Sequence, residues 1–165
     1  MSLDALDALY KEVILDHYQN PRNQHALAEP TVSTEGFNPV CGDQVHLELL
    51  VADGRIVDVS LHGKGCAISQ SSASMMTEAV KGMDIDDADG LAKAFRDYMT
   101  GHVDHPEREL GDLEVLDGVR KFPVRVKCAT LGWNTLQEAL KDFRSGEKSG
   151  RVVVDDGEDG EGSES

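Results

Sequence analysis

The chain has 165 residues, a size typical of one domain, and its 31 acidic against 16 basic residues give a net charge of −15. This charge argues against nucleic acid as a partner, because proteins that bind phosphate backbones are normally basic. The acids are spread along the whole chain, which favours an acidic, salt-adapted surface over a single site for a basic partner.

No stretch of about 18 apolar residues occurs, so no membrane span and no membrane partner are expected. The first residues, "MSLDALDALYKEV", also lack the basic block and the apolar block of a secretory signal. We therefore expect a cytoplasmic protein.

The first half of the chain predicts a helix followed by antiparallel strands. Apolar residues at helical spacing indicate a helix from Leu3, which ends at Asn20 because Pro21 disfavours helical backbone in the residue before it. A strand is expected over 31–37. The alternation of "QVHLELLVADGRIVDVSL" predicts two strands joined by a turn at Asp53-Gly54.

The second half predicts helices. We expect them over 67–81, 87–101 and 128–143, with a long polar connection between the last two that holds one short turn of helix. Residues 155–165 are acidic and of low complexity, which predicts a disordered tail. The expected organisation is an α+β domain over 1–146, with a small antiparallel sheet and helices packed on one face, followed by a tail over 147–165.

Three cysteines, Cys41, Cys66 and Cys128, could be buried filler, metal ligands or nucleophiles. Their odd number argues against a disulfide framework, and their spacing is not that of a zinc finger. Cys66 and Cys128 are each predicted at a helix N-terminus, where unpaired N–H groups and the helix dipole favour a thiolate. This placement favours a function over filler.

Asp43 follows Cys41 by two residues, so both side chains face one side if the segment is extended. Three thiolates and one carboxylate form a four-coordinate set that suits Zn²⁺ and leaves the site with a net negative charge. Arg125, Lys127 and Lys64 lie close to these residues in sequence and could offset that charge. A carboxylate is the most exchangeable of the four ligands, and a released Cys41 would be a competent sulfur nucleophile.

Four motifs, "LYKEVILDHYQNPRN", "NPVCGDQVHLEL", "GKGCAISQSSASMMTE" and "RVKCATLGW", together resemble the SufU proteins of iron–sulfur cluster assembly, relatives of the IscU scaffolds and of the NifU N-terminal domain. The resemblance covers residues 9–143 and implies a zinc site with Cys41, Asp43, Cys66 and Cys128 as ligands. It also implies a SufS-type cysteine desulfurase as partner, whose persulfide sulfur Cys41 attacks after leaving the zinc. Arg125 would stabilise the freed thiolate, and the sulfur would pass to the downstream cluster assembly machinery.

Two departures separate this chain from the IscU scaffolds. Lys127 stands where the scaffolds have a histidine directly before the third cysteine, and residues 101–115 are an insertion before that cysteine. Both departures favour the zinc-dependent, sulfur-transferring branch of the family. Two alternatives stay open: a scaffold that holds iron or a [2Fe–2S] cluster on the same residues, and a purely structural zinc domain.

Overall fold

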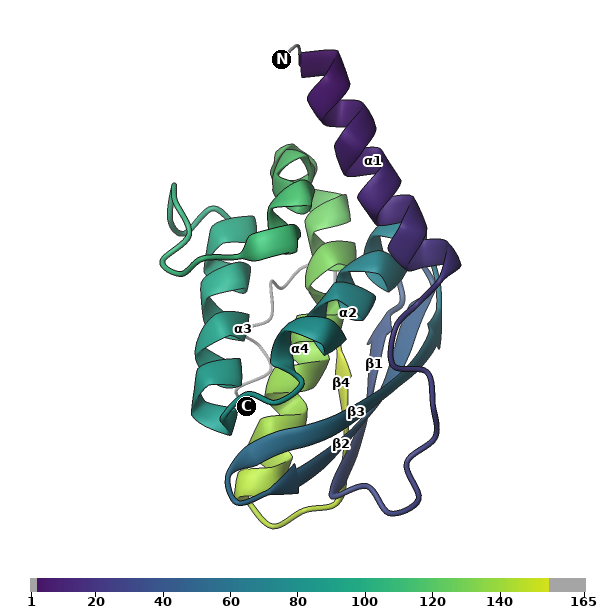
Figure 1. Ribbon diagram of the computed structural model, residues 1–165, viewed down its shortest axis with the longest axis vertical. Helices are drawn as coiled ribbons and strands as arrows, with labels where there is room; N and C mark the ends of the chain where they lie inside the picture. The colour runs from purple at the N-terminus through teal and green to yellow at the C-terminus, as the bar shows by residue number, and fades with distance from the viewer. Residues whose placement is uncertain (1–2, 155–165) are drawn as a thin grey trace.

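The computed structural model describes residues 3–154, which form one four-stranded sheet with helices on one face (Figure 1). In chain order the elements are α1 (Leu3–Gln19), β1 (Val32–Asn38), β2 (Asp43–Ala52), β3 (Arg55–Lys64), α2 (Ala67–Val80), α3 (Ile85–Met99), the 3₁₀ helix η1 (Gly111–Lys121), α4 (Pro123–Arg144) and β4 (Ser149–Val153). Within residues 3–154 no helix combines the length and the apolar character needed to cross a bilayer.

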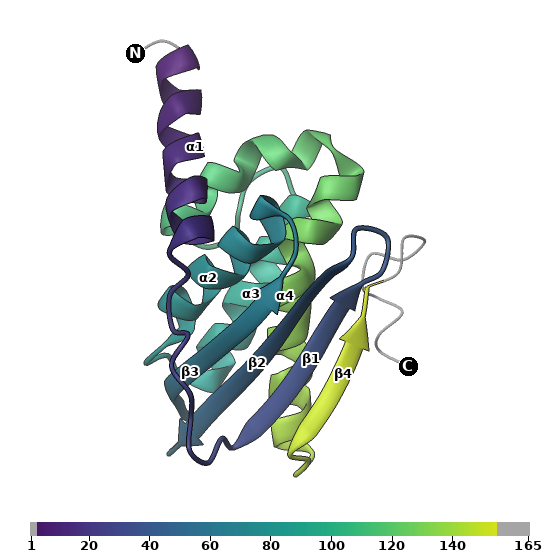
Figure 2. The ribbon, with the colours of Figure 1, turned by 90° about the vertical axis from the view of Figure 1, so that its right-hand side faces the viewer.

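The sheet has the strand order β3-β2-β1-β4, and Figure 2 shows its open face. The strands β1, β2 and β3 are antiparallel, as the alternation predicted. At the β2–β3 turn, Asp53 and Gly54 both have positive φ angles, of 54° and 75°. This is the backbone that a tight two-residue hairpin needs, and an Asp-Gly pair favours it.

The core lies between the sheet and α4, α2 and α3. Leu47 and Leu49 on β2 are fully buried, and so is Trp133 on α4, whose ring centroid lies 5.0 Å from that of Phe95 on α3. Each such side chain contributes roughly 2 kcal/mol by leaving water. A Cβ on Gly132 would approach the Ala73 Cβ to 2.9 Å, so this glycine lets α4 and α2 cross in close contact.

The structure corrects the predicted end of the domain. Residues 149–153 form β4, which pairs parallel to β1 and makes the sheet mixed instead of antiparallel. The boundary predicted at residue 146 is therefore too early, and the prediction of a disordered tail is wrong for these residues. Val152 and Val154 are buried beneath α4, which explains why this short segment joins the fold. The predicted tail over 155–165 lies outside the described residues.

Two helical segments also differ from the prediction. The connection before the last helix contains η1, which is 11 residues long and buries Leu113 and Leu116, instead of one short turn. The last helix begins at Pro123, not at Cys128, because proline suits the first helical position and the helix continues from there.

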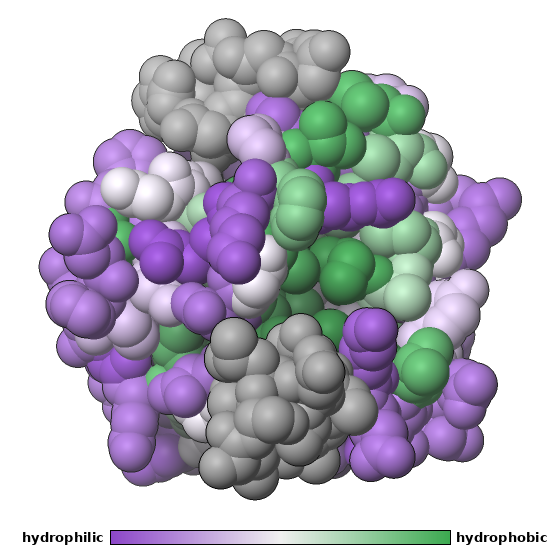
Figure 3. Space-filling model, turned by 90° about the horizontal axis from the view of Figure 1, so that it is seen from above, coloured by the Kyte–Doolittle hydropathy of each residue, from purple (hydrophilic) through white to green (hydrophobic). Residues whose placement is uncertain are grey.

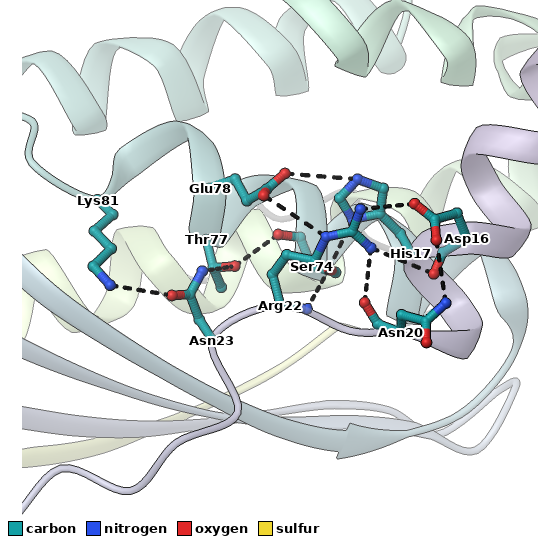
Figure 4. Close-up of polar contacts among 9 residues, drawn as sticks. All are labelled: Asp16, His17, Asn20, Arg22, Asn23, Ser74, Thr77, Glu78 and Lys81. Atoms are coloured by element: carbon teal, nitrogen blue, oxygen red, sulfur yellow. Dashed lines mark hydrogen bonds and ion pairs between the residues drawn. The ribbon is translucent and has the colours of Figure 1, made fainter.

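A polar network, here called the α1–α2 clamp, joins the end of α1 and the following loop to α2 (Figure 4). Buried His17 contacts the Ser74 hydroxyl through Nδ1 at 2.8 Å, and the backbone N–H of Arg22 donates to the same oxygen at 2.9 Å. Asn23 Nδ2 donates to Thr77 Oγ1 at 2.8 Å. His17 is thus a packed core histidine.

Candidate metal centre

Cys41 lies in the four-residue loop that joins β1 to β2. Asn38 pairs with Asp43 at the ends of these strands, and the Gly42 N–H donates to the Asn38 carbonyl at 2.9 Å, which closes the loop. Gly42 has a φ of 75°, a left-handed conformation that glycine adopts without strain. Cys41 is partly exposed, whereas Asp43, the first residue of β2, is only 1% exposed.

The thiol of Cys66 lies at the start of α2, as predicted. Cys66 is the N-cap residue, and its sulfur accepts the backbone N–H of Ser69 at 3.4 Å. Asp43 Oδ1 accepts the backbone N–H of Cys66 at 2.9 Å, and Asp43 Oδ2 lies 4.0 Å from the Cys66 sulfur. The end of the β1–β2 loop and the start of α2 are thus held together through one buried carboxylate.

Gly65 makes this approach possible. A Cβ at that position would lie 2.3 Å from Asp43 Oδ1, and the residue has a φ of 151°, which side chains rarely adopt. Any larger residue would push the Asp43 carboxylate away from the Cys66 N–H.

Cys128 completes the group from the second turn of α4. Its buried sulfur lies 3.5 Å from the Cys41 sulfur and 3.7 Å from the Val124 carbonyl. The predicted position at the helix N-terminus is wrong, because the helix begins at Pro123. Asn38 Nδ2 donates toward the Cys128 sulfur at 3.8 Å, a contact that sequence reasoning missed because nothing in the motif marks an asparagine three residues before Cys41.

The thiols of Cys66 and Cys128 differ in acidity. A hydrogen bond from Cys128 and the backbone N–H of Ser69 lower the pKa of Cys66 to about 6, against the cost of burial. The pKa of Cys128 is raised, because it gives that bond to Cys66 and is buried. Cys66 is therefore the thiol that ionises first in this pair.

Arg125 lies beside the same sulfurs. Its exposed guanidinium hydrogen-bonds the Cys128 sulfur, and this bond, together with the charges of Cys66, Cys128 and Cys41, raises the pKa of Arg125. The bond spans one helical turn. Arg125 and Lys127 lie two apart on a helix and therefore point to different sides.

The other two cations predicted near the site each line a pocket. Lys127 lines a pocket on another flank of α4, together with Val126 and Thr130. Lys64 lies beside His62 in a shallow pocket on the open face of the sheet, and both residues are exposed.

The donor set fits a metal ion. One ligand atom each from Cys41, Asp43 and Cys128 lie within 4.8 Å of one another, so these residues could hold a metal ion. Cys66 adds a fourth donor next to Asp43. The Asn38 Oδ1 atom is buried with no partner among the described residues, so the polar groups here are not saturated by one another. Three sulfurs and one carboxylate oxygen match the donors that Zn²⁺ takes in four-coordinate sites.

Comparisons with known proteins identify the family of this chain. The family of the NifU-like N terminal domain matches residues 9–149. The chain is 47% identical over 148 residues to the zinc-dependent sulfurtransferase SufU of Bacillus subtilis (strain 168), covering 88% of this chain and 99% of that protein. It is 40% identical to the iron–sulfur cluster assembly scaffold protein IscU of Streptococcus pyogenes serotype M1, over 86% of this chain and 88% of the relative.

Solved structures give the same result. A candidate iron–sulfur cluster assembly scaffold protein for the SUF system from Fervidobacterium islandicum AW-1 superposes with a TM-score of 0.73 at 34% identity, over 81% of this chain and 97% of that one. A NifU-like N-terminal protein from Brucella abortus has a TM-score of 0.76 at 24% identity, over 85% and 97%, which is a likeness of fold. With the resemblance seen in the four motifs thus confirmed, the chain belongs to the family of the NifU-like N terminal domain.

Proposed function

We propose that this protein is a zinc-dependent sulfurtransferase of iron–sulfur cluster assembly, in which Cys41 accepts persulfide sulfur from a SufS-type cysteine desulfurase. The observation that carries the proposal is the position of Cys41. It is partly exposed on a loop, yet its ligand atom lies within 4.8 Å of those of buried Asp43 and Cys128. One thiol is thus accessible to another protein while its neighbours are held by the fold.

In this proposal Cys41, Asp43, Cys66 and Cys128 hold the metal. Bound Zn²⁺ would supply the positive charge that keeps the coordinating thiols deprotonated at neutral pH. The exposed guanidinium of Arg125 adds a second, permanent positive charge beside the sulfurs. Cys41 is the donor best placed to leave the set, because it lies on a short loop, whereas Asp43 and Cys128 are buried on β2 and α4.

The transfer is a thiol–disulfide-type exchange at sulfur. The Cys41 thiolate attacks the terminal sulfur of the persulfide on the partner's cysteine, a new S–S bond forms on Cys41, and the old S–S bond breaks. The partner's cysteine leaves as a thiolate with the electron pair of that bond. The product is a Cys41 persulfide, which a later thiol acceptor in the cluster assembly machinery would take by the same exchange. Arg125 stabilises the attacking thiolate and the persulfide anion that replaces it.

An exposed apolar rim beside the thiols supports docking of a partner protein. Val40, Phe122 and Val124 are 50%, 58% and 55% exposed, although each is large and apolar. Val40 precedes Cys41, and the Val124 carbonyl contacts the Cys128 sulfur. Apolar groups gathered at one place on a surface mark protein contacts more often than scattered ones. A reducing compartment such as the cytoplasm suits the three free thiols.

The test is to mix zinc-loaded protein with a persulfide-charged cysteine desulfurase and to locate the transferred sulfur by mass spectrometry of the intact protein and its peptides. The proposal expects an added sulfur on Cys41 and stimulation of desulfurase turnover. Cys41→Ala should stay folded and abolish both. Persulfide on Cys66 instead, or full stimulation by Cys41→Ala, would contradict it. A purely structural zinc domain predicts that Cys41→Ala and Cys66→Ala unfold the protein equally.

A second candidate function is that of a scaffold, supported by the likeness to IscU proteins. The same three cysteines and Asp43 could hold iron or a nascent [2Fe–2S] cluster as cargo. Anaerobic reconstitution with iron, sulfide and desulfurase should then give a coloured species that transfers its cluster to an apo-ferredoxin. A colourless product that still carries zinc would count against the scaffold and for the sulfurtransferase.

A further inference from the structure

A pocket of about 420 Å³ lies on another flank of α4, away from the thiols. It forms where the end of α3, the end of η1, the start of α4 and the residue after β4 meet. Its size falls within the range of small-molecule sites. Figure 3 looks down on the end of the molecule where α4 begins and shows apolar side chains gathered between hydrophilic ones.

The charge of this pocket is opposite to that of the molecule. Arg120, Lys121 and Lys127 line it, and no acidic side chain stands among its described lining residues. The whole chain has 31 acids against 16 bases, so that a lining drawn at random would hold about twice as many acids as bases. Three like charges around one hollow repel one another and raise its positive potential. An anion in the pocket would relieve that repulsion.

Arg120 is already fixed in position. Its Nε donates to the Tyr98 carbonyl at 2.8 Å and its Nη2 to the Val103 carbonyl at 3.1 Å, while the guanidinium stacks 4.0 Å from the centre of the Tyr98 ring. These partners are neutral, and among the side chains of residues 11–154 neither Arg120 nor Lys121 forms an ion pair. The charge of the guanidinium is thus not neutralised by these partners, and its other N–H groups can donate to a ligand. Because the side chain is already ordered, binding a ligand costs less conformational entropy.

The rest of the pocket is apolar. Met99, Val126 and Val154 are 2%, 7% and 3% exposed and line it together with Pro123. Such walls favour an apolar group over water. An inorganic anion would leave these walls in contact with water, and a neutral apolar molecule would leave Arg120 and Lys121 without a counter-charge.

We propose that this pocket is a second binding site, which takes a small organic anion with an apolar body. Its acid group would face Arg120 and Lys121, and its body would lie against Met99, Val126 and Val154. The site is separate from the metal centre, because Val126 and Thr130 face it from the side of α4 opposite to Cys128. The inference therefore stands whether the protein transfers sulfur or carries a cluster.

The test uses the full, metal-loaded chain and anilinonaphthalene sulfonate, a fluorescent organic anion, with phenylnaphthylamine as the matched neutral probe that lacks the sulfonate. We expect saturable one-to-one binding of the anion, about tenfold or more tighter than that of the neutral probe. Methyl chemical shifts should change at Met99, Val126 and Val154. Equal affinity for both probes, or shifts at Val40 and Val124 on the apolar rim instead, would overturn the proposal.

Charge reversals provide the control. Lys121→Glu should weaken binding of the anion by about threefold or more, because it replaces an exposed attraction with a repulsion. Lys141→Glu, a matched reversal of another exposed lysine outside the pocket lining, should change it far less. Thermal unfolding of both variants checks that the fold is kept. Equal weakening by both reversals would show a non-specific charge effect and overturn the site.

Discussion

The metal centre and the α1–α2 clamp are two polar clusters in one small fold, and they use their polar groups in opposite ways. In the clamp, Ser74 contacts both His17 and the Arg22 N–H, so its hydroxyl is fully occupied by the protein. At the metal centre, the sulfurs of Cys41 and Cys128 lie 3.5 Å apart, and Asn38 Oδ1 is buried with no partner among the described residues.

This difference separates the clamp, which stabilises the fold, from the metal centre, which can bind a ligand. Hydrogen bonds that are complete within the protein stabilise a buried cluster and leave nothing for a ligand. Buried polar groups that lack hydrogen-bond partners lower the stability of the fold. They are retained where a bound ligand supplies the missing interactions. The comparison therefore predicts that substitutions at the metal centre impair metal binding first, and that substitutions in the clamp impair folding first.

The largest effect is expected for Asp43→Asn, which keeps the shape of the side chain but removes the charge and one strong donor. Zinc affinity should fall by about a hundredfold or more, since losing even an outer-shell partner costs ten- to a hundredfold. Asp58→Asn is the control, because that aspartate pairs with His25 and Lys81 away from the thiols. Competition with a chromophoric chelator measures both. Equal losses in the two variants would remove Asp43 from the metal set.

Gly65→Ala should come next. The added Cβ would lie 2.3 Å from Asp43 Oδ1 on a backbone with a φ of 151°, so the free energy of unfolding should drop by about 3 kcal/mol. Gly118→Ala is matched to it, because a Cβ there meets nothing within 4 Å and the backbone is not in the left-handed region. Urea unfolding of the two metal-free variants compares their free energies of unfolding. A change within error for Gly65→Ala would refute the close approach of this loop to Asp43.

Ser74→Ala tests the clamp itself. It removes the oxygen that both His17 and the Arg22 N–H contact, so unfolding should become easier by about 2 kcal/mol, the cost of leaving buried polar groups unpaired. Ser71→Ala is the control, since among the described residues that buried hydroxyl contacts the Ile68 carbonyl of its own helix, at 3.4 Å. Zinc affinity should be unchanged in both variants. Loss of zinc in Ser74→Ala would show that the two clusters are coupled.

The same comparison shows what the sequence could predict. Alternating residues on β2 and the Asp53-Gly54 pair are local signals, and the hairpin they predicted is present. Cys66 was placed at a helix start because "GKG" before it marks a tight entry, and it is the N-cap of α2. Turns and helix caps of this kind can be predicted from the sequence, because their residue preferences depend on a few neighbouring residues.

What escaped prediction depends on contacts distant in sequence. β4 pairs with β1 across more than a hundred residues, and a parallel pairing has no turn signal. The contact from Asn38 to Cys128 spans 90 positions. The start of α4 is different, because Pro123 is a favoured first helical residue and could have placed Cys128 one turn inside the helix.

The smallest predicted effect is a pH dependence of the clamp. Burial, and then the charge of Arg22, lower the pKa of His17 from its ordinary 6.5, while the charges of Glu78, Asp16 and Asp112 act in the opposite direction. The unfolded chain therefore binds the proton at a higher pH than the folded one. Between the two pKa values the unfolded state holds more protons, so stability rises with pH in that window and falls on acidification below about 6.5.

Carboxylates such as Asp16, whose pKa is lowered by its hydrogen bond with Arg22, also lose stabilising contacts in acid, so the wild-type profile alone does not isolate His17. The measurement is the difference in unfolding free energy between the wild type and His17→Gln, followed from pH 7.5 to 5. The variant is expected to be less stable at neutral pH and to lose less on acidification, because it has no imidazole to protonate. Parallel profiles would mean that His17 titrates alike in both states, and that the clamp, unlike the metal centre, is insensitive to protons at this position.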